Sequence, residues 1–128
     1  MSESIFVNQK DRISVTVMFA RNDGKTVIAK EGNSASSLTM EFRRPSYEDS
    51  QIILHSSSFA DESGRPVIDI IRLRKAALYH LAVGWDAKDG ETPVPITPDK
   101  ISEMDPVLAN EMAKRLEDHL GGASMFLA

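Results

Sequence analysis

The feature that most constrains this fold is a run of apolar residues at helical spacing between Pro66 and Trp85, the single tryptophan of the chain. Apolar side chains three and four positions apart line one face of a helix, and this set comprises Val67, Ile70, Ile71, Leu78, Leu81, Ala82 and Trp85. Pro66 suits a first helical position, where its missing N–H would have no partner. A helix of about twenty residues with such a stripe is not stable alone in water. The sequence therefore predicts a helix over 66–85 onto which the rest of the chain packs.

The N-terminal third of the chain alternates apolar and polar residues, as half-buried strands do. One run predicts a strand over 13–19, and a second predicts another over 38–42; the apolar positions are Ile13, Val15, Val17, Phe19, Leu38, Met40 and Phe42. Between them, Asn22-Asp23-Gly24 is typical of a tight hairpin turn. Residues 25–30 would then return as a strand. These patterns predict a small antiparallel β-meander.

Signals for helix starts recur in the second half of the chain. A capping-box pattern predicts a helix over 47–55 with Ile52, Ile53 and Leu54 as its buried part. Capping residues placed before first-turn prolines predict two later helices. These three signals are Ser46 with Asp49, Thr97-Pro98 and Asp105-Pro106. Residues 56–64 and 86–96 are predicted loops, and Phe59 is a candidate to insert into the core.

The patterns together predict an α+β fold in a single domain of 128 residues. Residues 1–43 are expected to be mainly β-structure, packed with about four helices within 46–120. Residues 121–128 are expected to form a tail, in which two glycines precede the apolar residues 123–128. The N-terminus has no secretion signal, and no stretch reaches the roughly 18 apolar residues of a membrane span. A cytosolic location is therefore expected, and a membrane partner is not.

Composition and motifs favour a non-enzymatic protein. The formal net charge of −4 argues against a nucleic-acid partner, which usually meets a basic face. Without cysteine, thiolate catalysis and cysteine-bound zinc are excluded. The three histidines are not spaced as metal ligands, and no nucleophile lies beside a base in a known motif. The sequence thus predicts no catalytic residue, no cofactor and no metal.

Four positive charges gather near the start of the predicted central helix, at Arg65, Arg72, Arg74 and Lys75. In a protein of negative net charge, this cluster is either a solvated helix face or a surface for an acidic partner. The predicted helix from Asp105 to Leu120 carries acidic residues, so self-association through opposite charges is a further alternative.

Apolar candidates for partner contact lie toward the C-terminus. Methionine packs adaptably, so clusters of it can serve binding surfaces. Met112 is one such candidate, although it also fits a core position, and the tail residues Met125, Phe126 and Leu127 are others. Trp85 is expected to be a core anchor that shapes the surface.

Four features in fixed order resemble the tail assembly chaperones of long-tailed bacteriophages, the small proteins encoded just ahead of the tape measure protein. A strand ends in Phe42-Arg43-Arg44-Pro45 and runs into a capped helix, and an acidic, serine-rich loop over 56–63 precedes an apolar helix. The other two features are the segment 81–86 (LAVGWD) and the loop 89–98 (DGETPVPITP). The resemblance covers residues 37–120.

The resemblance implies a non-enzymatic protein of the host cytoplasm. It would bind the long helical tape measure protein, keep it soluble and help to recruit tail tube subunits. The implied contacts are the basic set, Met112 and the tail, with Trp85 as anchor. Two alternatives remain from the sequence. One is a structural tail or connector protein that stays in the virion and exposes a strand edge, and the other is a small bacterial adaptor domain.

Overall fold

The computed structural model describes residues 4–29 and 36–122. In chain order, the elements are β1 (Arg12–Asn22), β2 (Lys25–Ile28), β3 (Ser36–Arg43), α1 (Tyr47–Ser57), β4 (Ser58–Ala60), β5 (Pro66–Ile68), α2 (Ile70–Leu81), β6 (Ala82–Trp85), β7 (Lys88–Asp89), β8 (Thr92–Pro93), α3 (Pro98–Ser102) and α4 (Pro106–His119). An antiparallel four-stranded sheet and four helices make up most of this part of the chain, which confirms the predicted α+β class.

The four-stranded sheet has the order β2-β1-β3-β6, which differs from the predicted meander. The hairpin forms where expected, and Asp23 and Gly24 both have the positive φ angles that such a turn requires. However, β3 pairs with β1 on the side opposite β2. Residue pairs such as Ile13 with Phe42 and Val17 with Leu38 place the apolar side chains of both strands on one face. In this register, β1 and β3 share one apolar face that the helices can cover.

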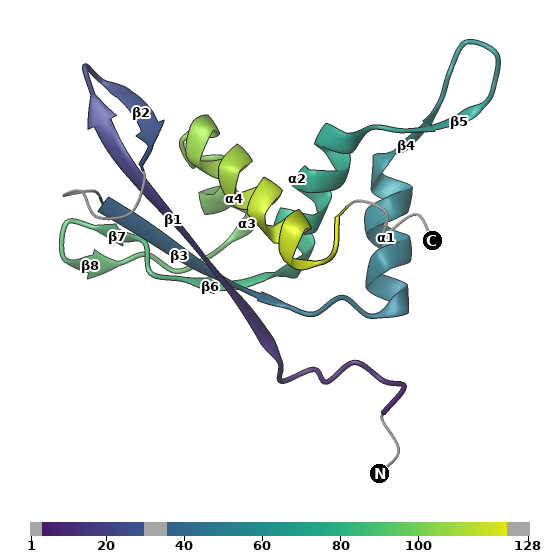
Figure 1. Ribbon diagram of the computed structural model, residues 1–128, viewed down its shortest axis with the longest axis horizontal. Coiled ribbons are helices and arrows are strands. Elements are labelled where there is room, and N and C mark those ends of the chain that lie inside the picture. The colour runs from purple at the N-terminus through teal and green to yellow at the C-terminus, as the bar shows by residue number, and fades with distance from the viewer. Residues whose placement is uncertain (1–3, 30–35, 123–128) are drawn as a thin grey trace.

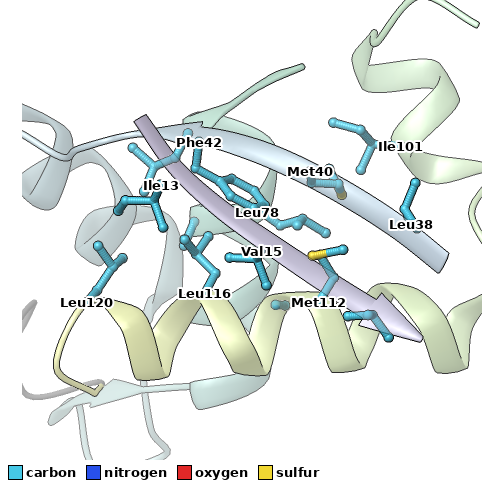
Figure 2. Packing of buried hydrophobic residues seen from close by; sticks show 14 of the residues in the cluster. Ile13, Val15, Leu38, Met40, Phe42, Leu78, Ile101, Met112, Leu116 and Leu120 are labelled. Atoms are coloured by element: carbon cyan, nitrogen blue, oxygen red, sulfur yellow. The ribbon is translucent and has the colours of Figure 1, made fainter. Parts of the chain in front are cut away.

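One face of this sheet is covered by helices and the other is open (Figure 1). On the covered face, β1 and β3 pack against α2 and α4; the buried side chains include Val15, Met40, Phe42, Leu78, Met112 and Leu116 (Figure 2). On the opposite face, Ser14 and Glu41 are exposed, and the hydroxyls of Thr16 and Thr39 lie 2.8 Å apart. The molecule therefore has one wet sheet face and one apolar core.

The central helix is shorter than predicted at both ends. It begins after Asp69, whose carboxylate accepts hydrogen bonds from the N–H groups of Ile71 and Arg72. Pro66 is the first residue of β5 and not of the helix, so the predicted helix start is wrong. The helix ends at Leu81, and Ala82–Trp85 pairs with β3 as the edge strand β6. Gly84 disfavours a helix, while valine and tryptophan favour a strand, so these residues pair with β3 and do not extend the helix.

The predicted helix over 47–55 is present as α1, which extends to Ser57. Its capping box forms as the sequence predicts, because the Ser46 side chain accepts from the Asp49 N–H and the Asp49 carboxylate accepts from the Ser46 N–H. Only part of the predicted buried stretch is buried. Ile53 is fully covered, whereas Ile52 is 44% exposed.

The predicted loop over 56–64 contains a strand and begins a hairpin. Strands β4 and β5 pair there, and Figure 1 shows this hairpin projecting beyond α1 and α2. Phe59 lies on the hairpin and is 43% exposed, so its predicted insertion into the core is wrong. The second predicted loop, over 86–96, similarly contains the short β7–β8 pair. The two proline-started helices form as predicted, capped by the side chains of Thr97 and Asp105.

A polar cluster joins the sheet to two helices. Asp49 at the start of α1 forms an ion pair with Arg43 at the end of β3, and its Oδ1 lies 2.9 Å from His80 Nε2 near the end of α2. Arg43 also donates to the backbone carbonyl of His80 at 3.1 Å. The hydrogen bond from Arg43 holds the pKa of Asp49 well below its ordinary value of 3.8, and those from Ser46 and His80 add to this effect, while burial opposes it.

The depressed pKa of Asp49 predicts an acid-dependent loss of stability. Its contribution is present above the pKa of the unfolded chain, near 3.8, and is lost as the pH falls below that value. In this range the single group contributes a slope of about 1.4 kcal/mol per pH unit to the free energy of unfolding. Urea unfolding followed by circular dichroism between pH 7 and pH 2.5 measures this slope. The Asp49→Asn variant should lack this part of the slope, and an identical acid profile in both proteins would contradict the assignment.

Candidate docking surface

The outward side of α2 forms a ridge between two surface grooves. Ile71, Arg72 and Lys75 are exposed on it, and Ile71 is 74% exposed although it is a large apolar residue. Tyr79, half-buried, continues the ridge toward the end of the helix. Two adjacent isoleucines, Ile70 and Ile71, cannot both face the core on one helix. The helix therefore displays apolar surface together with positive charge.

The first groove, here called the α1–α2 groove, lies between the two helices of that name. Its volume is about 540 Å³. Apolar side chains and aromatic carbon make up much of its wall, and the lining residues are Ile52, Ile53, Ser56, Arg72, Lys75, Ala76, Tyr79 and His80. None of these eight is an aspartate or glutamate. The lining is therefore positively charged, although the whole protein has a formal net charge of −4.

The second groove, here called the α2–α4 groove, lies on the other side of the ridge and has a volume of about 640 Å³. Helices α2, α3 and α4 and the segment between α3 and α4 contribute its lining, which includes Ile71, Arg74, Leu78, Met104 and Ala109. Lys75 and Tyr79 line both grooves. The two hollows and the ridge therefore form one continuous surface on the outside of the helices.

The structure divides the predicted basic set into different roles. Arg72 is on the ridge, with its guanidinium carbon 5.3 Å from the centre of the Phe59 ring and its Nε 3.7 Å from Asp69. Lys75 lies 5.8 Å from the Tyr79 ring. These two side chains are exposed beside apolar surface, as a contact for an acidic partner would require.

The other two predicted basic residues have different surroundings. Arg74 points toward α4, where its Nε lies 2.5 Å from the Glu117 carboxylate, and this hydrogen bond raises the pKa of the guanidinium. Arg65 is in the β4–β5 turn, where its backbone N–H donates to Asp61. The clustering in sequence thus brings Arg72 and Lys75 together at the ridge, while Arg74 is neutralised within the fold.

Met112, predicted as a partner contact, and Trp85, predicted as a core anchor, both pack against the core. Met112 is fully buried in α4, against β1 and β3 (Figure 2), so its prediction as a partner contact is wrong in this fold, and it is a core residue. Trp85 is half-buried on β6, packs against the core and donates its indole N–H to the Val94 carbonyl at 2.7 Å. It therefore ties the β7–β8 segment to the sheet. Met125, Phe126 and Leu127 lie outside the described residues.

Sequence reasoning missed most of the apolar half of this surface. The sequence pattern places Ile52 in the core because it belongs to a continuous Ile-Ile-Leu run, and Ile71 because it fits the helical period. The sequence did contain a sign of this exposure, because one helix face is too narrow to bury every apolar residue of such a run. One apolar side chain in each run must therefore face outward.

Comparison with known proteins returns no relative: no family model, curated protein or solved structure matches the chain. Within residues 4–29 and 36–122, no group of three or more acidic or histidine side chains could hold a metal ion. No helix in the part of the chain that the structure describes is long and apolar enough to cross a membrane. The function is therefore inferred from the surface geometry and the sequence features.

Proposed function

We propose that this protein is a tail assembly chaperone of a long-tailed bacteriophage, acting in the host cytoplasm without catalysis. It binds the tape measure protein, keeps it soluble and helps to recruit tail tube subunits. The single observation that carries the proposal is the outward face of α2, where Ile71, Arg72 and Lys75 are exposed between two grooves. Exposed apolar surface with a charged rim is typical of a protein-binding site.

The proposal also rests on the sequence resemblance described above. A long helical protein with apolar stripes would aggregate without a partner, and a groove between helices can cover such a stripe. The α1–α2 groove and the α2–α4 groove supply two such surfaces on one side of a small domain. On the open sheet face, Val27 and Val83 are also exposed, but neither lines either of these two grooves.

Co-expression with the tape measure protein of the same phage tests the proposal. We expect the tape measure protein to be soluble and to co-purify when this chain is present, and to aggregate when it is absent, because its apolar stripes are then uncovered. Removal of residues 123–128 from the full chain measures the contribution of the predicted tail contacts. Solubility of the tape measure protein that does not depend on co-expression would refute the proposal.

A structural tail protein is the second candidate, favoured by the open sheet. The outer strands β2 and β6 are its two edges, and a strand edge can pair with another subunit. Mass spectrometry of purified virions separates the two functions. A chaperone should be absent from finished particles, whereas a structural subunit should be present in fixed copy number.

A further inference from the structure

We propose that the α1–α2 groove binds an amphipathic helix whose apolar stripe is flanked by aspartate and glutamate. This deepens the proposed function and rests on it only for the identity of the natural partner. Of the two grooves on the docking surface, this one is thereby assigned a partner of defined chemistry.

The shape and apolar content of the groove suit a helix. Along α2, the lining runs from Arg72 to His80, which spans about two helical turns. On the facing wall, Ile52 and Ser56 are one turn apart on α1. A partner helix with apolar residues at positions i, i+4 and i+7 places successive side chains along a groove of this length. Ile52, 44% exposed, is the apolar residue on the α1 wall that gains most from being covered.

The charges on the rim select an acidic partner. Arg72 and Lys75 line the groove, and no carboxylate is among the lining residues. Across the described residues, Lys75 forms no salt bridge, while Arg72 has only the 3.7 Å pair with Asp69, a contact in which the Arg72 side chain is 58% exposed. Such exposed charges add little affinity individually, but they determine which partner is accepted and which is repelled.

The α2–α4 groove offers a weaker preference for an acidic partner. Its arginine, Arg74, is already paired with Glu117 at 2.5 Å, and Asp118 adds a further negative charge nearby. Lys75 lines this groove too, but beside the paired Arg74, whereas the α1–α2 groove has both exposed cations, Arg72 and Lys75. The charge balance therefore favours the α1–α2 groove as the acidic-helix site.

Two synthetic peptides test this assignment. Both are helices of about 20 residues with the same leucine stripe; one carries glutamate and the other lysine at the positions flanking the stripe. Fluorescence anisotropy with the full chain should show the glutamate peptide binding about tenfold more tightly than the lysine peptide at low salt. High salt should reduce this difference, because the rim charges are exposed.

Variants connect the binding to the groove. Lys75→Glu should remove the preference for the glutamate peptide, whereas Lys114→Glu is the matched control, since this exposed lysine on α4 lines neither groove. Ile52→Asn should weaken both peptides without changing the preference, because it removes apolar contact and adds no charge. Lys75 lines both grooves and Ile52 only the α1–α2 groove, so this second variant identifies the groove. Circular dichroism checks that each variant is folded. Equal binding of the two peptides, equal effects of Lys75→Glu and Lys114→Glu, or undiminished peptide binding by Ile52→Asn would overturn the proposal.

The outcomes also separate this proposal from the proposed function. Groove-dependent binding of the glutamate peptide by a chain that does not bind the tape measure protein would refute the chaperone function and support the groove assignment. Tape measure binding that is unaffected by Lys75→Glu and Ile52→Asn would refute the groove assignment and leave the chaperone function standing.

Discussion

Replacing Asp49 with alanine is expected to lower the free energy of unfolding by about 3 kcal/mol. The carboxylate is 11% exposed and pairs with Arg43, which is itself only 24% exposed. Its removal leaves that guanidinium without its acidic partner, and it also deletes the hydrogen bonds to His80 and to the Ser46 N–H. These contacts join β3, α1 and α2, so three elements lose a common link. Urea unfolding at pH 7, followed by circular dichroism, measures the change.

Glu48→Ala is the matched control for this prediction. Glu48 precedes Asp49 in the first turn of the same helix and is also acidic, but it is exposed and has no ion pair among the described residues. Its replacement should change the free energy of unfolding by less than about 0.5 kcal/mol. Similar losses in the two variants would mean that the helix dipole, and not the Arg43–Asp49–His80 cluster, accounts for the effect.

The second large effect is expected at Phe42. Phe42→Ala should destabilise the fold by about 3–5 kcal/mol, because loss of a large core side chain leaves a cavity between the sheet and the helices. The Phe42 side chain is fully buried on β3. Figure 2 shows it directed into the cluster that contains Leu78 and Ile13. Denaturant midpoints at constant slope give the difference in stability.

Phe59→Ala provides the comparison for a phenylalanine outside the core. Phe59 is 43% exposed on the β4–β5 hairpin, and its notable contact is with Arg72. The expected loss is less than about 1 kcal/mol, the size of an exposed cation–π contact. Comparable losses for the two variants would contradict the position of the core described above.

Local signals predicted the framework of this fold well. The alternation around Val15 and Met40 identified β1 and β3, because only one face of the sheet is covered. The capping patterns at Ser46, Thr97 and Asp105 located three helix starts, since each side chain satisfies backbone N–H groups that have no partner within the helix. Such signals act within a few residues, so the sequence alone contains them.

The errors arose where distant partners decide the structure. Helical spacing continues to Trp85, but the segment Ala82–Trp85 becomes a strand because the edge of β3 lies beside it. Pro66 fits a helix start as well as it fits the strand position that it occupies, and the cap at Asp69 was the overlooked local signal. The order of the strands in the sheet could not be predicted from the sequence either, because the pairing of β3 with β1 depends on the tertiary arrangement.

The candidate site was predicted only in part. Arg72 and Lys75 were identified from their local excess of charge, but the neutralisation of Arg74 depends on Glu117, 43 residues away. Met112 illustrates the opposite error, since a methionine that packs adaptably at a surface packs equally well in a core. Charge patterns therefore indicated the region, while the helix arrangement determined which residues face outward.

The contact between the last helix and the first strand has a consequence for synthesis on the ribosome. Arg115 on α4 donates to the Thr16 carbonyl on β1, a contact between residues 99 apart, and Leu116 lies beside the apolar side of that strand. A nascent chain that has emerged only as far as α2 has a sheet whose apolar side chains are incompletely covered. Folding is therefore expected to finish only after translation of α4, and stalled or truncated products should be substrates for general chaperones and proteases.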